Sequence, residues 1–196
     1  MIEIKNIFKS FGSSEVLIDI SAKFERGKTN LIIGQSGSGK TVLLKCLLGL
    51  YTTDNGELIY DNIYSSRMND EEKINIKKEM GMVFQGSALF DSMTVLENVR
   101  FPLDMLTKYS DAEKNEIALK FIDRVNLNDA INKLPSEISG GMQKRVGIAR
   151  AIVLNPKYLF CDEPNSGLDP KTAIVIYNLI QEITKESVSY THLTLP

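Results

Sequence analysis

The chain has 196 residues, of which 43% are apolar and 24% are charged, and its net charge is −2. This length suits one sizeable core. The slightly acidic balance argues against nucleic acid as a partner, because nucleic-acid binders usually carry a strong basic excess. The start of the chain does not resemble a signal peptide, and no stretch approaches the roughly 18 apolar residues of a membrane span. We therefore expect a soluble, cytoplasmic chain.

Strands and helices are predicted to alternate along the sequence. Alternating or continuous apolar runs predict strands at residues 2–11, 16–24, 29–34, 56–66, 81–85 and 157–162, the fourth being a strand pair with a turn at 54–56. Helical spacing predicts helices at residues 40–50, 70–80, within 94–134, at 142–155 after a glycine pair, and at 169–186. Such alternation favours an α/β fold with a mainly parallel sheet. The two cysteines, Cys46 and Cys161, lie in apolar runs and are expected to be buried, reduced thiols.

The stretch "GQSGSGKT" fits the phosphate-loop pattern between an apolar strand and a helix. Its glycines let successive backbone N–H groups face phosphate oxygens, and the helix start adds a partial positive charge. The lysine can reach the β- and γ-phosphates, and the threonine hydroxyl can bind Mg²⁺. The sequence therefore predicts a nucleotide site formed by Gly34, Gln35, Ser36, Gly37, Ser38, Gly39, Lys40 and Thr41.

Two acidic residues follow the apolar run "YLFC" at a predicted strand end. Ligands in open α/β sheets bind at such carboxyl ends. Asp162 can hold Mg²⁺, directly or through water, and Glu163 can act as general base on the attacking water. A second glycine turn at a helix start, "SGGMQ", predicts another anion site. A chain with two such sites can pair head to tail as a C2 dimer, with each nucleotide between two subunits.

With "VFQ" and "SGLD" in the expected order, these motifs make residues 1–186 resemble the nucleotide-binding subunit of ABC transporters. The resemblance implies an ATPase that uses ATP and Mg²⁺, with Lys40, Gln85 and Glu163 in catalysis. The implied metal ligands are Thr41, Gln85 and Asp162. The implied signature loop is Ser139, Gly140 and Gly141, and the implied D-loop is Ser166, Gly167, Leu168 and Asp169. Phe11 matches the aromatic residue that stacks on adenine, although a core position is an equal alternative.

The same resemblance predicts an α/β P-loop NTPase (RecA-like) core with an N-terminal antiparallel β subdomain and an ABC-type α-helical subdomain. Residues 1–87 and 138–186 would form the β subdomain and core, and residues 88–137 the helical subdomain. The family expects a further apolar strand and a histidine on the γ-phosphate. The interval from Asp169 to His192 is too short for that, and "SVSYTHLTLP" lacks a parallel strand's continuous apolar run.

We therefore expect residues 187–196 to be a non-native tail, with 188–196 resembling translated sequencing adapter. The C-terminal strands would then be missing, the native gene would be cut short near Glu186, and the chain would be poorly active. His192 is accordingly not predicted as a site.

Within the family, Met142 stands where the signature usually has glutamine, with Gln143 following. Together with residues 84–103, this resembles the ATPases of Mla/MCE-type phospholipid transporters. The implied partners are a second ATPase subunit, an integral membrane permease and an MCE-type lipid-binding protein, but no nucleic acid. The implied location is the cytoplasmic face of the inner membrane. Residues 88–90 and 101–106 could dock the permease or belong to the core. The alternative function is a soluble ABC-type ATPase acting on nucleic acid or ribosomes.

Overall fold

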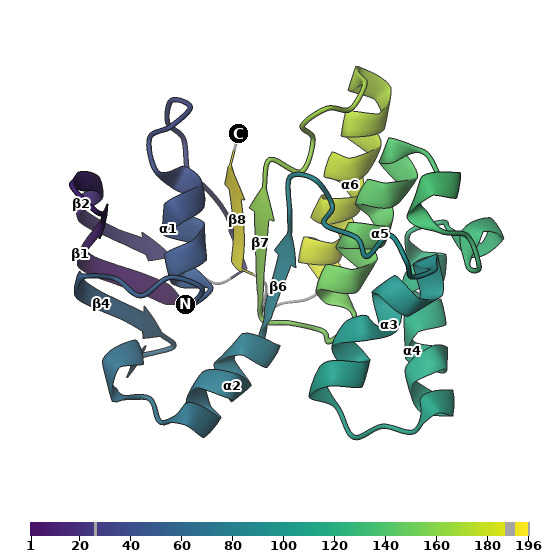
Figure 1. Cartoon of the computed structure of the whole chain (residues 1–196), viewed down its shortest axis with the longest axis horizontal. Helices are drawn as coiled ribbons and strands as arrows, with labels where there is room; N and C mark the ends of the chain where they lie inside the picture. Colours follow the sequence, from purple (N-terminus) through teal and green to yellow (C-terminus); the bar gives the residue numbers. More distant parts are fainter. Residues whose placement is uncertain (26, 187–190, 196) are drawn as a thin grey trace.

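The computed structural model describes residues 1–25, 27–186 and 191–195, the last five as backbone only. Two sheets and a group of helices make up the molecule (Figure 1). The strands are β1 (Ile2–Phe11), β2 (Ser14–Phe24), β3 (Thr29–Leu31), β4 (Asn55–Tyr60), β5 (Ile63–Tyr64), β6 (Met80–Val83), β7 (Tyr158–Asp162) and β8 (Thr191–Leu195). The α-helices are α1 (Lys40–Leu47), α2 (Asp70–Lys78), α3 (Val95–Leu106), α4 (Asp111–Arg124), α5 (Gly140–Ile152) and α6 (Pro170–Glu186).

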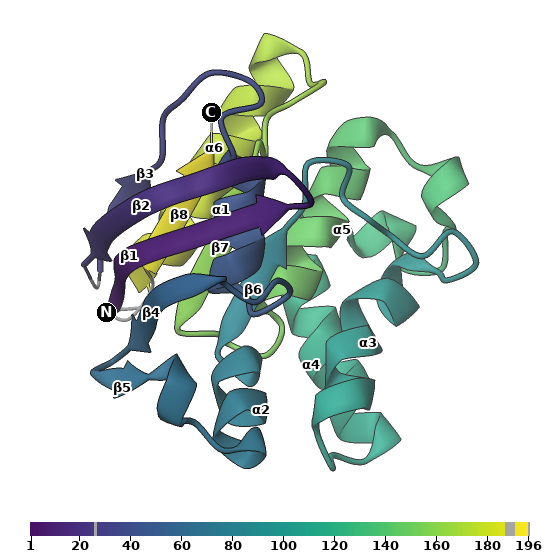
Figure 2. The same cartoon turned by 60° about the vertical axis from the view of Figure 1, so that its left-hand side comes forward.

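The strands form an antiparallel sheet in the order β2-β1-β4-β5 and a parallel sheet in the order β3-β8-β7-β6. Helix α1 lies between the two sheets, and α5 and α6 cover the other side of the parallel sheet (Figure 2). Helices α3 and α4 stand beside α5 at the far end of the molecule. This arrangement confirms the predicted P-loop NTPase-type α/β fold, with its antiparallel β subdomain and its helical part.

Two buried apolar clusters stabilise this layout. One joins the antiparallel sheet to α1 and one face of β7, through residues such as Ile4, Leu44 and Phe160. The other joins the helical part to the opposite face of the same strand, through residues such as Val99 and Leu159. Successive strand residues point to opposite faces, so β7, buried along its whole length, belongs to both clusters. The acidic residues at its carboxyl end are therefore held from two sides.

Two predicted elements differ from the structure. The expected strand at 29–34 ends at Leu31, and the expected turn at 54–56 falls at the start of β4. The turn of that strand pair lies instead at Asp61 and Asn62, which have φ values of 47° and 70°. Consecutive left-handed residues are typical of a type I′ hairpin turn, and Asp and Asn tolerate that region better than most residues do.

The backbone of Thr191–Leu195 forms β8, which pairs in parallel with β3 on one side and β7 on the other. The expectation that this stretch lacks strand structure is therefore wrong. Between β3 and β7, two rows of backbone N–H and C=O groups need partners, and an extended segment can supply them whatever its side chains. Residues 187–190 and 196 of the predicted tail lie outside the described residues, and the adapter origin stays a prediction.

Candidate nucleotide site

The phosphate loop lies between β3 and α1, as the sequence predicts. Gly37 and Gly39 have φ values of 80° and 90°, in the left-handed region that favours glycine. A Cβ on Gly39 would come within 3.0 Å of the Val16 side chain, so this position also requires the absence of a side chain. The Lys40 ammonium donates to the Gly34 carbonyl at 2.7 Å and to the Gln35 carbonyl at 3.2 Å. Lys40 thus lies on the loop itself, within reach of phosphate bound there.

Asp162 lies at the carboxyl end of β7 beside the start of α1. The Thr41 hydroxyl is 3.3 Å from its Oδ2 and 3.5 Å from its Oδ1. The Asp162 side chain is buried, and burial raises the pKa of this carboxyl, with the neighbouring Glu163 adding to the rise and the Thr41 hydroxyl opposing it. A hydroxyl and a carboxylate oxygen side by side are the ligand types that Mg²⁺ prefers. Thr41 and Asp162 could therefore hold a magnesium ion, which would supply positive charge beside bound phosphate.

Glu163, the residue after Asp162, contacts Gln85. The Gln85 amide donates to Glu163 Oε2 at 2.7 Å and lies 3.3 Å from the Ser166 hydroxyl. Glu163 has a φ of 45°, which is uncommon for a residue with a side chain and is found most often at functional sites. The structure thus brings the predicted ends of β6 and β7 together, with Gln85, Asp162 and Glu163 converging near the phosphate loop.

The predicted signature loop lies apart from these residues, at the start of α5. The Ser139 hydroxyl caps the helix by accepting from the Met142 N–H at 3.3 Å. A cavity of about 520 Å³ there is lined by Ser139, Gly140, Gly141 and the D-loop residues Gly167, Leu168 and Asp169, among others. Asp169 caps α6, accepting from the Lys171 N–H at 3.0 Å, and hydrogen bonds from Thr172 lower the pKa of its carboxyl. The predicted signature loop and three residues of the predicted D-loop therefore line one cavity, and no phosphate-loop residue lines it.

Phe11 lies next to the turn after β1, where its ring is 44% exposed. It contacts the Tyr51 ring edge-on, with 5.3 Å between the ring centres, and the Lys9 ammonium lies over it. The core alternative for Phe11 is therefore wrong, and its role against adenine stays a prediction. Cys46 and Cys161 are buried and form no disulfide, as expected, and burial raises the pKa of each thiol.

Lys144 lies beside the site but is not among the residues predicted from the sequence. Its side chain is only 6% exposed, and its ammonium donates to the Gln85 carbonyl. Burial lowers the pKa of Lys144, and the nearby Glu163 carboxylate opposes this change. The sequence feature that could have identified Lys144 is its place on an otherwise apolar face of the helix. A lysine there needs a hydrogen-bond acceptor when that face is buried.

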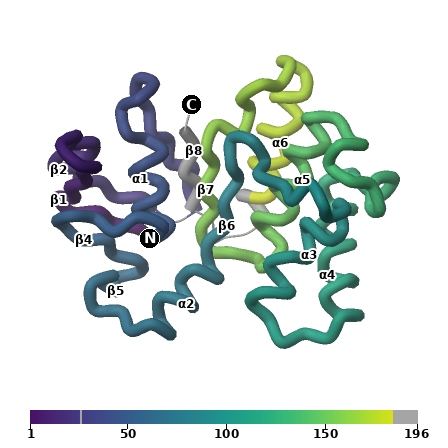
Figure 3. Tube along the Cα trace, in the orientation of Figure 1, coloured from purple at the N-terminus to yellow at the C-terminus, as the bar shows by residue number. Residues whose placement is uncertain are grey.

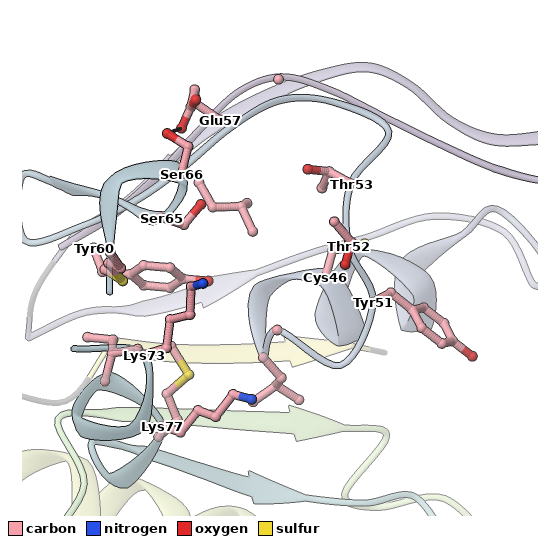
Figure 4. A pocket seen from close by; sticks show the side chains of 17 residues that line it. Cys46, Tyr51, Thr52, Thr53, Glu57, Tyr60, Ser65, Ser66, Lys73 and Lys77 are labelled. Atoms are coloured by element: carbon pink, nitrogen blue, oxygen red, sulfur yellow. Dashed lines mark hydrogen bonds between the residues drawn. The ribbon is translucent and has the colours of Figure 1, made fainter. Parts of the chain in front are cut away.

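A further cavity of about 490 Å³ lies at the opposite end of α1 from the phosphate loop (Figure 4). It is bordered by the end of α1, by β4 and by α2, and Lys73 and Lys77 project toward it. Helix α1 has eight residues and is therefore about 12 Å long, so this cavity is separate from the nucleotide site. None of the predicted site residues lines it.

The fold and the site together define a P-loop nucleotide-binding domain. The family model described as "ABC transporter" matches residues 17–166. The probable ribonucleotide transport ATP-binding protein mkl of Mycobacterium leprae is 40% identical over 94% of this chain and 53% of its own length. The L-cystine import ATP-binding protein TcyC of Bacillus subtilis is 38% identical over 95% of this chain and 76% of its own length. The chain therefore belongs to the ABC transporter family.

Solved structures agree with this assignment. The dimeric bacterial ABC transporter cassette MJ0796 superposes with a TM-score of 0.89 at 32% identity, over 100% of this chain and 87% of that one. Its post-hydrolysis form, bound to ADP and phosphate, superposes with a TM-score of 0.88. The chain spans about half the length of the mycobacterial relatives it matches. Within the described residues, no helix is long and apolar enough to cross a membrane.

Proposed function

We propose that the chain is the ATP-binding and ATP-hydrolysing subunit of an ABC transporter. The observation that carries the proposal is the convergence of Gln85, Asp162 and Glu163 beside the phosphate loop. Mg²⁺, when bound, would be held by Thr41 and Asp162 and would neutralise charge on the β- and γ-phosphates. Lys40 would exchange its loop carbonyls for phosphate oxygens. Glu163 would accept the proton of the attacking water, which Gln85 helps to orient.

The second half of the site would come from another copy of the chain. The signature loop lies at a helix N-terminus, where backbone N–H groups and the helix dipole favour an anion. Because it lies apart from Lys40 in the same chain, it can complete the site only in a head-to-tail dimer, in which each ATP is covered by the partner's loop. The MJ0796 cassette, to which this chain is similar, is dimeric, and this supports the pairing of two such subunits.

Glu163→Gln tests the chemistry. The amide cannot accept a proton, so we expect the hydrolysis rate to fall about 100- to 10,000-fold, the usual contribution of a general base. ATP binding should persist because the phosphate loop is unchanged, and ATP should then hold the variant as a dimer, measured by light scattering. The exposed Glu116→Gln on α4 is the control and should keep the unmodified rate. Full hydrolysis by the Glu163→Gln variant would contradict the assignment.

The membrane partner would dock beside Gln85. A groove of about 310 Å³ is lined by Phe84, Phe90 and Leu106, among others, and these three large apolar side chains are exposed. Of the two predicted docking stretches, Leu89 and Leu103 instead contribute to the core. We propose that the groove takes an apolar cytoplasmic segment of the permease. Leu106→Asp should then abolish co-purification with the permease while the hydrolysis rate stays unchanged; retained binding would contradict the proposal.

For the cargo, we propose phospholipid, with an MCE-type lipid-binding protein as a further partner on the other side of the membrane. The support is the resemblance of the signature and of residues 84–103 to Mla/MCE-type ATPases. The relatives' names differ, including ribonucleotide and L-cystine transport, and those names belong to those proteins. The complete transporter in liposomes should accelerate ATP-dependent transfer of fluorescent phospholipid. ATPase stimulation by L-cystine instead of phospholipid would contradict a lipid cargo.

A further inference from the structure

Helix α5 lies against the segment that follows β6, here called the Q-loop segment (residues 84–90) (Figure 3). Three residues of α5, spaced by three, make the contact. Lys144 donates to the Gln85 carbonyl, and Arg150 donates to the Ser87 carbonyl at 2.7 Å. Gly147 lies between them, where an added Cβ would be 3.4 Å from the Ser87 carbonyl oxygen. Lys144, Gly147 and Arg150 are called the α5 clamp below.

The α5 clamp contacts a part of the Q-loop segment whose backbone conformation is unfavourable by itself. Ser87 and Ala88 have φ values of 61° and 47°, and two consecutive residues with side chains in this region are strained. Such backbone persists only where its surroundings fix it. Lys144 as a whole residue is only 6% exposed, so moving the Q-loop segment away from α5 would leave a largely buried charge without the Gln85 carbonyl as its acceptor. The helix and the Q-loop segment should therefore move together.

This coupling reaches the reactive groups through Gln85. The backbone carbonyl of Gln85 is held by Lys144, while its side-chain amide contacts Glu163 at 2.7 Å. A shift of the Gln85 backbone thus changes the distance from its amide to Glu163. Helix α5 begins at the signature loop, where Ser139 caps it little more than one turn before Lys144. The helix consequently connects the partner-facing loop directly to Gln85.

We propose that Lys144 is a positioning residue, assisted by Arg150, which fixes Gln85 against Glu163 and transmits movement of the signature loop to it. The inference rests on the proposed ATPase function for its catalytic consequence. The structural part of the inference, that Lys144 fixes the Q-loop segment, can be tested without nucleotide. Two measurements therefore test the structural part and the catalytic part separately.

The first measurement is amide hydrogen exchange of the Q-loop segment in the nucleotide-free chain. Lys144→Met should speed exchange at residues 86–88 about tenfold, because local opening no longer breaks the clamp. Lys144→Arg keeps a charged donor and should stay within about threefold of the unmodified chain. Lys157→Met is the control, since it removes only the ion pair with Glu79 at the start of β6. Unchanged exchange in Lys144→Met would overturn the proposal.

The second measurement is the split between kcat and KM for ATP. Because the phosphate loop is untouched, Lys144→Met should lower kcat at least tenfold while KM stays within about threefold, and Lys144→Arg should recover most of kcat. Equal loss in both constants, or no recovery with arginine, would assign Lys144 a merely structural role and overturn the proposal.

The proposal can still be tested if the unmodified chain hydrolyses no ATP or if Lys144→Met does not fold. If the unmodified chain hydrolyses no ATP, the proposed function fails, while the exchange experiment still decides on the clamp. If Lys144→Met does not fold, Arg150→Gln serves instead. It removes the charged donor from the Ser87 carbonyl and should raise exchange at residues 86–88, whereas unchanged exchange would again contradict the inference.

Discussion

At the scale of single residues, the reactive groups are placed by backbone conformations that few residues adopt. Gly39 and Glu163 both have positive φ, one at the start of α1 and the other just after β7. For Gly39 the sequence predicts the positive φ, because glycine is the residue that adopts this conformation easily. For Glu163 it does not, since glutamate has no such preference. The motif identified the residue, but only the structure shows that it is turned toward Gln85.

Tyr60 provides a residue-scale test of how the end of α1 is held. Its buried hydroxyl donates to the Leu47 carbonyl at 2.6 Å, and burial raises the pKa of the phenol above its usual range. Tyr60→Phe leaves that carbonyl unsatisfied and should lower the free energy of unfolding by about 1–2 kcal/mol, measured by chemical denaturation. The exposed Tyr109→Phe is the control and should change little.

The same residue predicts a pH dependence. The raised pKa keeps Tyr60 neutral in the folded chain, whereas the unfolded chain ionises it above about pH 10. The contribution of Tyr60 to stability is therefore present below pH 10 and is lost as the pH rises beyond it. Denaturation curves for Tyr60→Phe and for the unmodified chain should become less different between pH 9 and about 11. A constant difference would contradict this account.

At the scale of elements, helix starts carry a clearer pattern in the sequence than strand ends do, although the starts of α3 and α4 were predicted only as lying within residues 94–134. Helices α2, α3 and α4 each begin with a capping box, formed for α4 by Ser110 and Glu113, a pattern visible in the sequence. Strand β3 ends early because the chain must turn into the phosphate loop, and the hairpin turn falls at Asp61 and Asn62. Both outcomes depend on neighbouring strands, which lie far away in the sequence.

The capping box of α4 gives a prediction at this scale. The Ser110 hydroxyl accepts from the Glu113 N–H, and Ser110→Ala should cost about 1 kcal/mol of unfolding free energy. Hydrogen bonds from the Ser110 hydroxyl and N–H lower the pKa of Glu113. The charged Glu113 carboxylate therefore stabilises the folded chain at pH values above its pKa in the unfolded chain, near 4.5. This stabilisation is lost as the pH falls through the lower pKa that Glu113 has in the folded chain. Acid titrations followed by circular dichroism should show a shallower unfolding transition in Ser110→Ala than in the unmodified chain. The control is Ser136→Ala, which changes an exposed serine outside α4.

At the scale of the whole molecule, the sequence predicted the two sheets, the helical part and the meeting of the phosphate loop with Asp162. The pairing of β8 could not be predicted, because its sequence lacks the apolar run expected of a strand in a parallel sheet. The contact of α5 with the Q-loop segment could not be predicted from the sequence either. Periodicity identifies the buried face of a helix but not the segment that covers it.

Leu193→Pro tests the role of β8 in the sheet. Proline removes a backbone N–H from a strand paired on both sides, so we expect a loss of soluble protein and a lower melting temperature by several degrees. Leu193→Val keeps the N–H and a strand-favouring side chain, and should fold like the unmodified chain. An unchanged melting temperature in Leu193→Pro would instead favour the view that residues 188–196 are a foreign tail.

The position of β8 also has a consequence for biosynthesis. Strand β3 leads into the phosphate loop and β7 leads to Asp162, yet the two are joined in the sheet only through β8, which is translated after both. Domains generally assemble as the ribosome delivers the chain, beginning with its N-terminal part. The loop and its acidic partner should thus remain unassembled until β8 has emerged. A nascent chain lacking β8 would capture nucleotide poorly, which delays ATP binding until β8 has left the ribosome.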